Sequence, residues 1–289
     1  MKKGLLIVFT TLLLIGCAQA PETQISNKDD VIVTVNGKSI TKGDVYTMMS
    51  HQDISSDIIN LAKDYLVDSK VEVTEELKKE AQKFLAEQKE LLGEFFKTYY
   101  GELTDEELLE EYFIPAQKQV QLMKAYFDAN KDAILEANKP LKYLELTFDT
   151  QEKAEQALTR IKANEDIKKV VEELGTKGAN YQFEATVGST STIPAIVSEY
   201  LKSDEAKQLT WIKTPLKDTT TQKYLLIKTE ELDSMKLMDE YRDVFASEAA
   251  NIDKVFTEEF KNEDFRVYDQ AIYDSIISNK ELVNFKPNN

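Results

Sequence analysis

Two stretches of helical sequence flank a small segment of mixed strand and helix pattern, and this arrangement is the strongest constraint on the fold. Over residues 31–138 and 232–261, apolar residues recur mainly at the spacing of amphipathic helices. Over residues 139–231 the pattern changes to apolar strands separated by helices, which is typical of a small α+β unit. We therefore predict an α+β protein, mainly helical, in which helical segments flank an inserted middle domain.

The first residues have the layout of an export signal. Lys2 and Lys3 precede an uncharged apolar run from Leu5 to Ile15, which is too short to span a bilayer as a permanent helix. We therefore predict a signal peptide over residues 1–16. Its end, Leu-Ile-Gly-Cys, resembles the lipobox of bacterial lipoproteins, in which the cleavage site lies just before the cysteine and the cysteine thiol carries a diacylglycerol. The resemblance implies that Cys17, the single cysteine of the chain, carries the lipid.

Two acyl chains on Cys17 would anchor the protein stably to a membrane. Without residues 1–16 the chain has 34 basic and 52 acidic side chains, a formal charge of −18. Anionic lipid headgroups repel such a surface, so the anchor and not the protein surface is expected to hold it there. Residues 17–30 are polar and aperiodic, and we predict that they form the lipidated N-terminus and a flexible linker.

Composition excludes several classes of function. The acidic charge argues against nucleic acid as a partner, because phosphate binding depends on clustered Lys and Arg. One cysteine and one histidine exclude a thiolate cluster and any site that needs two imidazoles. We expect no metal and no cofactor. The single histidine, His51, is interpreted as a solvated residue at a helix end.

The helical segments carry clear start signals. Residues 31–41 alternate as two short strands around Asn36-Gly37, a pair that favours a tight hairpin turn. A helix is predicted over residues 53–67. Capping residues at Thr41 with Asp44, at Thr74, and at Thr104 with Glu107 predict three further helix starts. The last two helices are predicted to carry apolar stripes of Leu77, Ala81, Phe84, Leu85, Leu92, Phe95 and Tyr99, and of Leu109, Tyr112, Ala116, Val120, Met123 and Phe127.

The middle domain is predicted to begin and end with a strand. LKYLELTF and QKYLLIKTE are apolar strands, and three helices are expected over TQEKAEQALTRIKA, EDIKKVVEEL and IPAIVSEYLKSDEA. Trp211 is interpreted as a packing residue before the last strand. The acidic pairs Glu106-Glu107 and Glu110-Glu111 suit the positive start of a helix and need no metal to explain them.

Together these segments resemble the PrsA secretion foldases, relatives of the chaperone SurA and of trigger factor. The resemblance rests on VTVNGKSITKGDVYTMM, VEVTEELKKEAQKF and YYGELTDEELLEEYFIPAQKQVQLMKAYF, on their order, and on the lipobox before them. It implies one helical chaperone domain built from residues 31–138 and 232–289, interrupted by a parvulin-like domain at residues 139–231. It further implies a lipid-anchored protein on the extracytoplasmic face of a Gram-positive cell membrane, where it would assist the folding of secreted proteins.

The chain departs from the parvulin pattern where the chemistry of that family resides. Its two expected histidines are replaced by Glu145 and Leu225, and the Gly-Gly-Asp-Leu-Gly turn is missing. The family polar centre is a hydrogen-bonded cluster around those histidines, which Glu and Leu cannot reproduce. We therefore expect prolyl isomerase activity to be weak or lost, and no catalytic residue is assigned. An active isomerase and a solute-binding lipoprotein remain the alternatives.

The expected partners are unfolded or partly folded exported proteins, and the sequence leaves open whether the chain forms a homodimer. A chaperone of this kind binds them through exposed apolar side chains on a soluble frame. Most members of the apolar stripes are expected to be core residues. The candidates for binding clients are Tyr99, Tyr100, Tyr112, Phe113, Tyr126 and Phe127.

Overall fold

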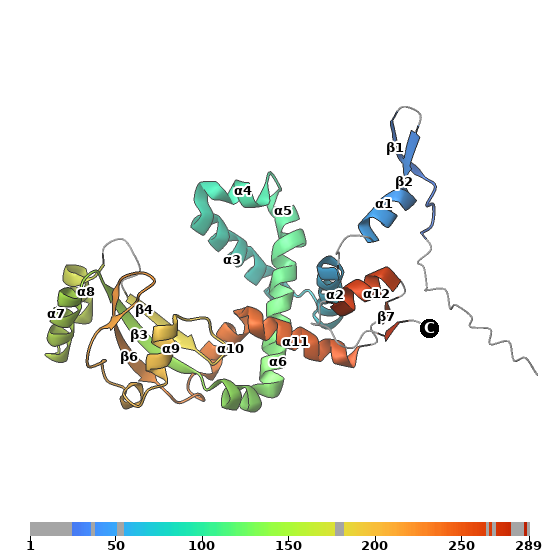
Figure 1. Cartoon of the computed structure of the whole chain (residues 1–289). Helices are drawn as coiled ribbons and strands as arrows, with labels where there is room; N and C mark the ends of the chain where they lie inside the picture. The colour runs from blue at the N-terminus through green and yellow to red at the C-terminus, as the bar shows by residue number, and fades with distance from the viewer. Residues whose placement is uncertain are drawn as a thin grey trace, which may run out of the picture. The chain divides into compact units, whose positions relative to one another are not determined.

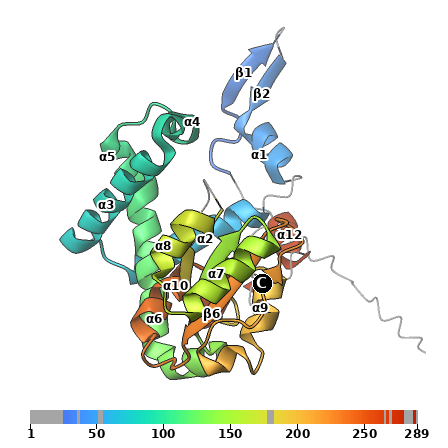
Figure 2. The ribbon, with the colours of Figure 1, turned by 90° about the vertical axis from the view of Figure 1, so that its left-hand side faces the viewer.

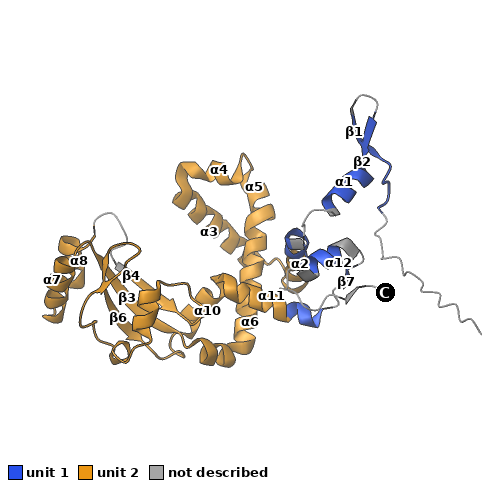
Figure 3. Cartoon of the chain, in the orientation of Figure 1, with its two compact units in different colours: residues 1–62, 259–289 blue, residues 63–258 orange. Residues whose placement is uncertain are grey.

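The computed structural model divides into two compact units, one of residues 1–62 with 259–289 and the other of residues 63–258 (Figure 3). The residues that it describes are 25–35, 38–50, 55–176, 182–263, 266–267, 270–278 and 286–287. The predicted signal peptide, Cys17 and His51 lie outside these ranges. None of the helices in these ranges combines the length and the hydrophobicity that spanning a bilayer requires.

The first unit contains the N-terminal hairpin. Strands β1 (Val31–Val35) and β2 (Lys38–Thr41) pair antiparallel, as the sequence predicted, and helix α1 (Lys42–Ser50) follows directly. The backbone N–H of Thr41 donates to the Asp44 carboxylate at 2.9 Å, and the Asp44 N–H donates to the Thr41 hydroxyl at 3.2 Å. This reciprocal pair is the predicted capping box, and it fixes the start of α1.

The C-terminal part of the same unit is a short closing motif. Strand β7 (Arg266–Val267) pairs parallel with β8 (Lys286–Pro287), and helix α12 (Gln270–Ser278) packs against β7. The side chains of Val267 and Ile276 are buried.

The second unit begins with the end of α2. A series of helices follows, and we call the part from α3 to η2 the arm (Figure 1). The elements are α2 (Ser55–Lys70), α3 (Glu75–Leu92), η1 (Gly93–Phe95), α4 (Phe96–Tyr100), α5 (Asp105–Leu108), the π-helical turn η2 (Leu109–Phe113) and α6 (Ile114–Asn138); the arm is α3 to η2. Thr74 caps α3 by accepting from the Leu77 N–H, and Thr104 with Glu107 forms a full capping box. These predicted helix starts are confirmed.

The apolar stripe predicted for α3 is wrong at its C-terminal end. Gly93 has a φ of +51°, a left-handed backbone conformation that ends α3 and changes the direction of the chain. After this turn Phe96 and Tyr100 pack with Leu103 and Phe113, whereas Phe95 and Tyr99 are exposed. The prediction failed because it continued one helical period through a glycine that interrupts the helix.

The stripe predicted after Thr104 is wrong at Tyr112 for a related reason. The turn η2 has π-helical hydrogen bonding, which adds a residue to the turn and shifts the helical periodicity. Phe113 is consequently buried against Phe84, with ring centroids 5.6 Å apart, and Tyr112 is exposed. Further along, Met123 and Phe127 are fully buried in α6, as the stripe predicted.

The middle domain is built on a four-stranded antiparallel sheet in the order β4-β3-β6-β5. Strands β3 (Leu141–Phe148) and β6 (Tyr224–Glu231) were predicted and form its centre. Strands β4 (Gln182–Val187) and β5 (Leu216–Lys217) were not predicted. Strand β5, with two residues, is too short to show a period.

Three helices complete this domain, close to the predicted segments. They are α7 (Gln151–Lys162), α8 (Ile167–Leu174) and α9 (Ala195–Leu201). Helices α7 and α8 lie together on one side of the sheet, and α7 runs beside β6 (Figures 1 and 2). All three contribute buried side chains to one core with β3 and β6, and Trp211 packs against it as predicted.

The C-terminal helical segment returns to α6. It forms α10 (Met238–Ser247) and α11 (Ala249–Asn262), separated at Glu248, whose backbone is extended. Tyr241 and Phe245 of α10 pack on Phe127 with ring centroids 6.2 and 5.4 Å apart. Residues more than a hundred positions apart in the sequence thus share one core.

The loop after β4 joins the middle domain to this core. The Ser189 N–H donates to the Asn138 carbonyl at 2.9 Å, and the Thr190 hydroxyl donates to Glu248 at 2.8 Å. Lys142 of β3 forms an ion pair with Glu240 of α10 at 3.3 Å. The loop occupies the sequence position of the missing glycine turn and makes contacts with α6 and with the α10–α11 segment.

Candidate functional site

The sheet brings together the two positions where the family resemblance places histidines. Glu145 lies opposite Ile227, and Thr147 lies opposite Leu225, in the β3–β6 register. Because side chains alternate along a strand, Glu145 and Leu225 share one face of the sheet on neighbouring strands. The residues Tyr143, Ile227 and Thr229 lie on that same face.

Glu145 is a carboxyl group in an environment that disfavours its charge. It is partly buried, and within the described residues it has neither a hydrogen-bond donor nor a cationic partner. Burial raises its pKa, and the like charge of Asp218 raises it further. Asp218 itself accepts from the Thr221 hydroxyl at 2.6 Å and the Thr220 N–H at 2.9 Å, which lower its pKa and keep it charged.

The rest of this face is apolar or carries hydroxyls. Leu225 is buried and offers no hydrogen bond. The hydroxyl of Thr229 on this face and that of Tyr200 on helix α9 are buried without a hydrogen-bond partner in the described chain, and burial raises the pKa of Tyr200 to about 12. Prolyl isomerisation must lower an amide barrier of about 18–20 kcal/mol by favouring the twisted amide. A carboxyl and an isobutyl group at the two central positions do not supply the polar cluster of the parvulins.

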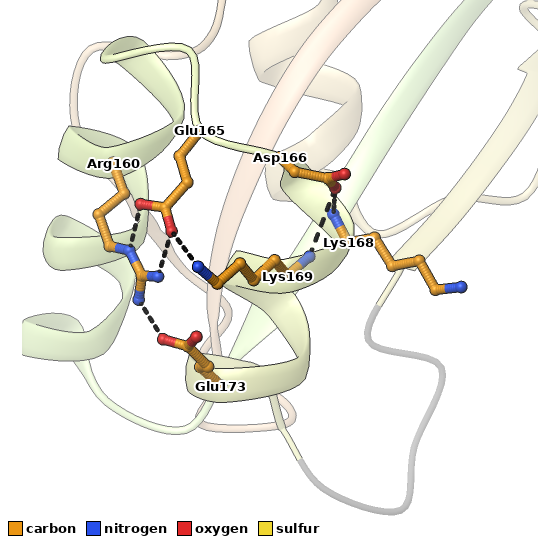
Figure 4. A network of polar contacts seen from close by, with 6 residues as sticks. All are labelled: Arg160, Glu165, Asp166, Lys168, Lys169 and Glu173. Carbon is orange, nitrogen blue, oxygen red and sulfur yellow. Dashed lines mark hydrogen bonds and ion pairs between the residues drawn. The ribbon is translucent and has the colours of Figure 1, made fainter.

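A network of charges fixes α8 on α7 in the same domain (Figure 4). The Arg160 guanidinium donates to both carboxylate oxygens of Glu165 and, at 2.7 Å, to Glu173. Asp166 caps α8 by accepting from the Lys168 N–H. Two-point contact with Glu165 raises the pKa of Arg160 and lowers that of Glu165. These charges satisfy one another, so we assign the network a structural role.

The arm exposes a second candidate site, made of large apolar side chains. The exposed fractions are 76% for Leu91, 70% for Phe95, 72% for Tyr99 and 47% for Tyr112. We call these four residues the arm surface. The residues next to three of them, Leu92, Phe96 and Tyr100, are turned inward and only partly exposed. Aromatic contacts hold this inner layer, with Tyr100 packed 5.6 Å from Phe113 between ring centroids.

The candidate client-binding residues occupy different environments. Tyr99 and Tyr112 are exposed on the arm, and Tyr100 is half-buried beneath them, with its ring centroid 5.7 Å from that of Tyr112. Tyr126 is partly buried against the α6–α10 core. Phe113 and Phe127 are buried in packed cores and are not available to a client.

Sequence reasoning missed two residues of the arm surface. Leu91 was not singled out, and Phe95 was assigned to the buried stripe. Gly93 lies between them, and a glycine within a helical pattern is a signal for a helix end that could have corrected the assignment. No group of three or more His, Cys, Asp or Glu side chains in the described ranges is arranged to hold a metal ion.

Comparisons with known proteins identify the fold. No protein-family model and no curated protein sequence matches the chain. Among solved structures, the foldase protein PrsA of Streptococcus pneumoniae aligns with a TM-score of 0.52 and 15% identity, over 86% of this chain and 98% of that one. PrsA of Bacillus subtilis aligns with a TM-score of 0.43 and 20% identity, over 87% and 99% of the two chains. PrsA of Bacillus cereus gives a TM-score of 0.42 and 18% identity, over 88% and 99%.

Proposed function

We propose that this chain, which has the fold of the S. pneumoniae PrsA foldase, is a lipid-anchored chaperone that binds exported proteins before they have folded. The arm surface is the observation that carries the proposal. Folded proteins rarely leave several large apolar side chains of one segment exposed without a partner for them, and three of these four are at least 70% exposed. Reversible contact with the apolar segments of an unfolded chain explains that exposure and prevents aggregation of the client.

The arm can present this surface because its own core does not depend on it. Phe84, Phe96, Tyr100 and Phe113 pack with one another beneath the exposed residues. The exposed rings therefore add little to the stability of the arm, and a client can cover them without rearranging the inner layer. A surface of this kind binds weakly and without a fixed sequence, as a chaperone requires.

The middle domain acts in this proposal as part of the frame, with prolyl isomerase activity weak or absent. Glu145 and Leu225 support that view, since an acceptor and an apolar group replace two hydrogen-bonding rings. The proposed domain boundaries are residues 31–138 and 232–289 for the chaperone domain and 139–231 for the middle domain. The lipobox supports anchoring through Cys17 on the extracytoplasmic face of a Gram-positive membrane.

The proposal is tested by aggregation of a chemically denatured secreted protein, measured by light scattering. Residues 18–289, which include every described residue, are expected to suppress aggregation at a few-fold molar excess. The double substitution Phe95→Ser with Tyr99→Ser is expected to remove most of the protection, because it deletes the apolar contacts without touching a core. Tyr65→Ser is the control, since Tyr65 is 67% exposed but lies on α2. Absence of protection by the unmodified chain at high excess would overturn the proposal.

A further inference from the structure

The distal part of the arm, residues 83–113, is strongly acidic for its size, and the cations within it are already paired. Residues 83–113 contain nine Asp and Glu and three Lys, a net charge of −6. Lys83 pairs with Glu87 at 3.6 Å, Lys97 pairs with Glu102 at 3.0 Å, and Lys89 pairs with an aspartate of α5. No positive charge of this segment is left to neutralise the remaining carboxylates.

Four of the unpaired carboxylates flank the arm surface in the sequence. They are Glu90, Glu94, Glu110 and Glu111. All four are exposed, and none has a salt bridge or a side-chain hydrogen bond among the described residues. Glu90 and Glu94 adjoin Leu91 and Phe95, and Glu111 adjoins Tyr112. The arm surface itself is therefore apolar, and the residues beside it in the sequence carry negative charge.

We infer that the arm surface selects unfolded segments in which aromatic or aliphatic residues are interspersed with Lys and Arg. This inference rests on the proposed chaperone function and specifies its substrate class. Apolar side chains of the client cover the arm surface. The Lys and Arg side chains of the client form ion pairs with arm carboxylates that lack a partner. Charge complementarity raises the rate of encounter, and segments rich in Asp and Glu are rejected by like charge.

The same charges disfavour two other occupants. A second copy of the chain would bring one acidic arm against another acidic surface, and the two would repel. An anionic membrane is repelled for the same reason. A cationic, apolar polypeptide segment is the occupant that satisfies both the exposed rings and the free carboxylates.

The inference is tested by fluorescence anisotropy with two labelled peptides and residues 18–289. Both peptides contain the same Phe and Leu residues at the same spacing, with Lys between them in one and Glu in the other. We expect the Lys peptide to bind about tenfold more tightly at low salt, and this preference to shrink as salt screens the charges.

Charge variants then locate the effect. Replacing Glu90, Glu94, Glu110 and Glu111 by Gln should reduce the preference for Lys to about twofold or less, while leaving the affinity for the Glu peptide unchanged or improved. A matched control replaces four exposed glutamates outside the arm, Glu136, Glu152, Glu172 and Glu199, by Gln. The control removes the same total charge and should keep most of the preference.

The outcomes separate this inference from the proposed function. Equal binding of both peptides, reduced by Phe95→Ser with Tyr99→Ser, would overturn the charge selection and leave the chaperone proposal intact. A preference lost equally in both glutamate variants would also overturn it, because total charge and not the arm would then be responsible. Failure to bind either peptide, together with failure to suppress aggregation, would overturn both.

Discussion

Gly188 lies directly against the ring of Tyr241. A Cβ atom built on Gly188 would come within 2.6 Å of Cζ and 2.8 Å of Cε2 of that ring, and Tyr241 is fully buried. Gly188 follows β4 of the middle domain, whereas Tyr241 belongs to α10. Only a residue without a side chain allows the loop after β4 to approach α10 so closely.

We predict that Gly188→Ala destabilises the joint between the middle domain and α10. The ring cannot move away from the added methyl group without disturbing its contact with Phe127, so the cost is about 1–3 kcal/mol. Thermal unfolding followed by circular dichroism measures it. Tyr241→Leu frees space for the methyl group, so the double variant should lose less than the sum of the two single variants. Strict additivity would contradict the clash.

Removing Asp68 from the Lys118–Asp68 ion pair should cost more folding stability than removing Lys118. The side chain of Lys118 is 8% exposed and that of Asp68 is 65% exposed. Asp68→Ala leaves a buried ammonium without its counter-charge and is expected to cost about 3 kcal/mol. Lys118→Met leaves a carboxylate that water can solvate, and it should cost less than 1 kcal/mol. Chemical denaturation of both variants tests the order, and a larger loss for Lys118→Met would contradict it.

Glu145 should make the middle domain less stable as the pH rises. Its pKa is raised in the folded state, so the folded state binds a proton more tightly than the unfolded state does. This contribution to stability is complete below the unfolded pKa and is lost as the pH rises through the folded value. Glu145→Gln is therefore expected to raise the melting temperature at neutral pH by about 2 °C, and to have no effect in acid.

The single tryptophan makes this measurement specific to the middle domain. Trp211 packs against the core of that domain and forms an isolated antiparallel β-bridge with Lys228 of β6, so its fluorescence follows unfolding there. Glu152→Gln, an exposed change in the first turn of α7, is the control and should not raise the melting temperature at neutral pH, because a negative charge is favourable at the start of a helix. A lower melting temperature for Glu145→Gln at neutral pH would show that the carboxylate is stabilised by a favourable partner.

A protease-coupled assay on a proline peptide should give the uncatalysed rate at neutral pH. An ionised Glu145 only accepts hydrogen bonds, and Leu225 neither donates nor accepts. Because the pKa of Glu145 is raised, any residual activity should increase as the pH falls and the protonated carboxyl becomes a donor. An active parvulin is the positive control. Clear catalysis that falls on acidification would contradict this prediction.

Lipidation of Cys17 should be required for membrane attachment. In a Gram-positive host the unmodified chain is expected in the membrane fraction, with an N-terminal peptide whose mass includes the acyl chains. Cys17→Ala should remove the modification and shift the protein out of the membrane fraction. Attachment of the variant at the level of the unmodified chain would contradict the proposed anchor.

Local signals in the sequence were sufficient wherever neighbouring residues decide the conformation. The capping boxes at Thr41 and Thr104 depend on side chains three residues away, and both form as predicted. Strands β3 and β6 were visible because they are long, apolar runs. Strand β5 was not, because two residues show no period and the strand exists only through pairing with β6.

The arm surface depends on two turns that helical periodicity does not predict. Two local events, the positive φ of Gly93 and the π-helical turn before Ile114, change which apolar residues face the core. They turn Phe95, Tyr99 and Tyr112 outward and place Phe113 in the core. Periodicity treats each apolar residue of a stripe alike, so it could not separate core residues from exposed ones.

The α+β class, the helix starts, the central strands and the absence of histidine at positions 145 and 225 could all be read from the sequence, because they follow from residue identity and short-range spacing. Which aromatic rings are exposed, which carboxylates lack a partner and how closely Gly188 approaches Tyr241 became known only from the packed structure. Each of these depends on residues distant in the chain that meet only when the helices and the sheet have packed.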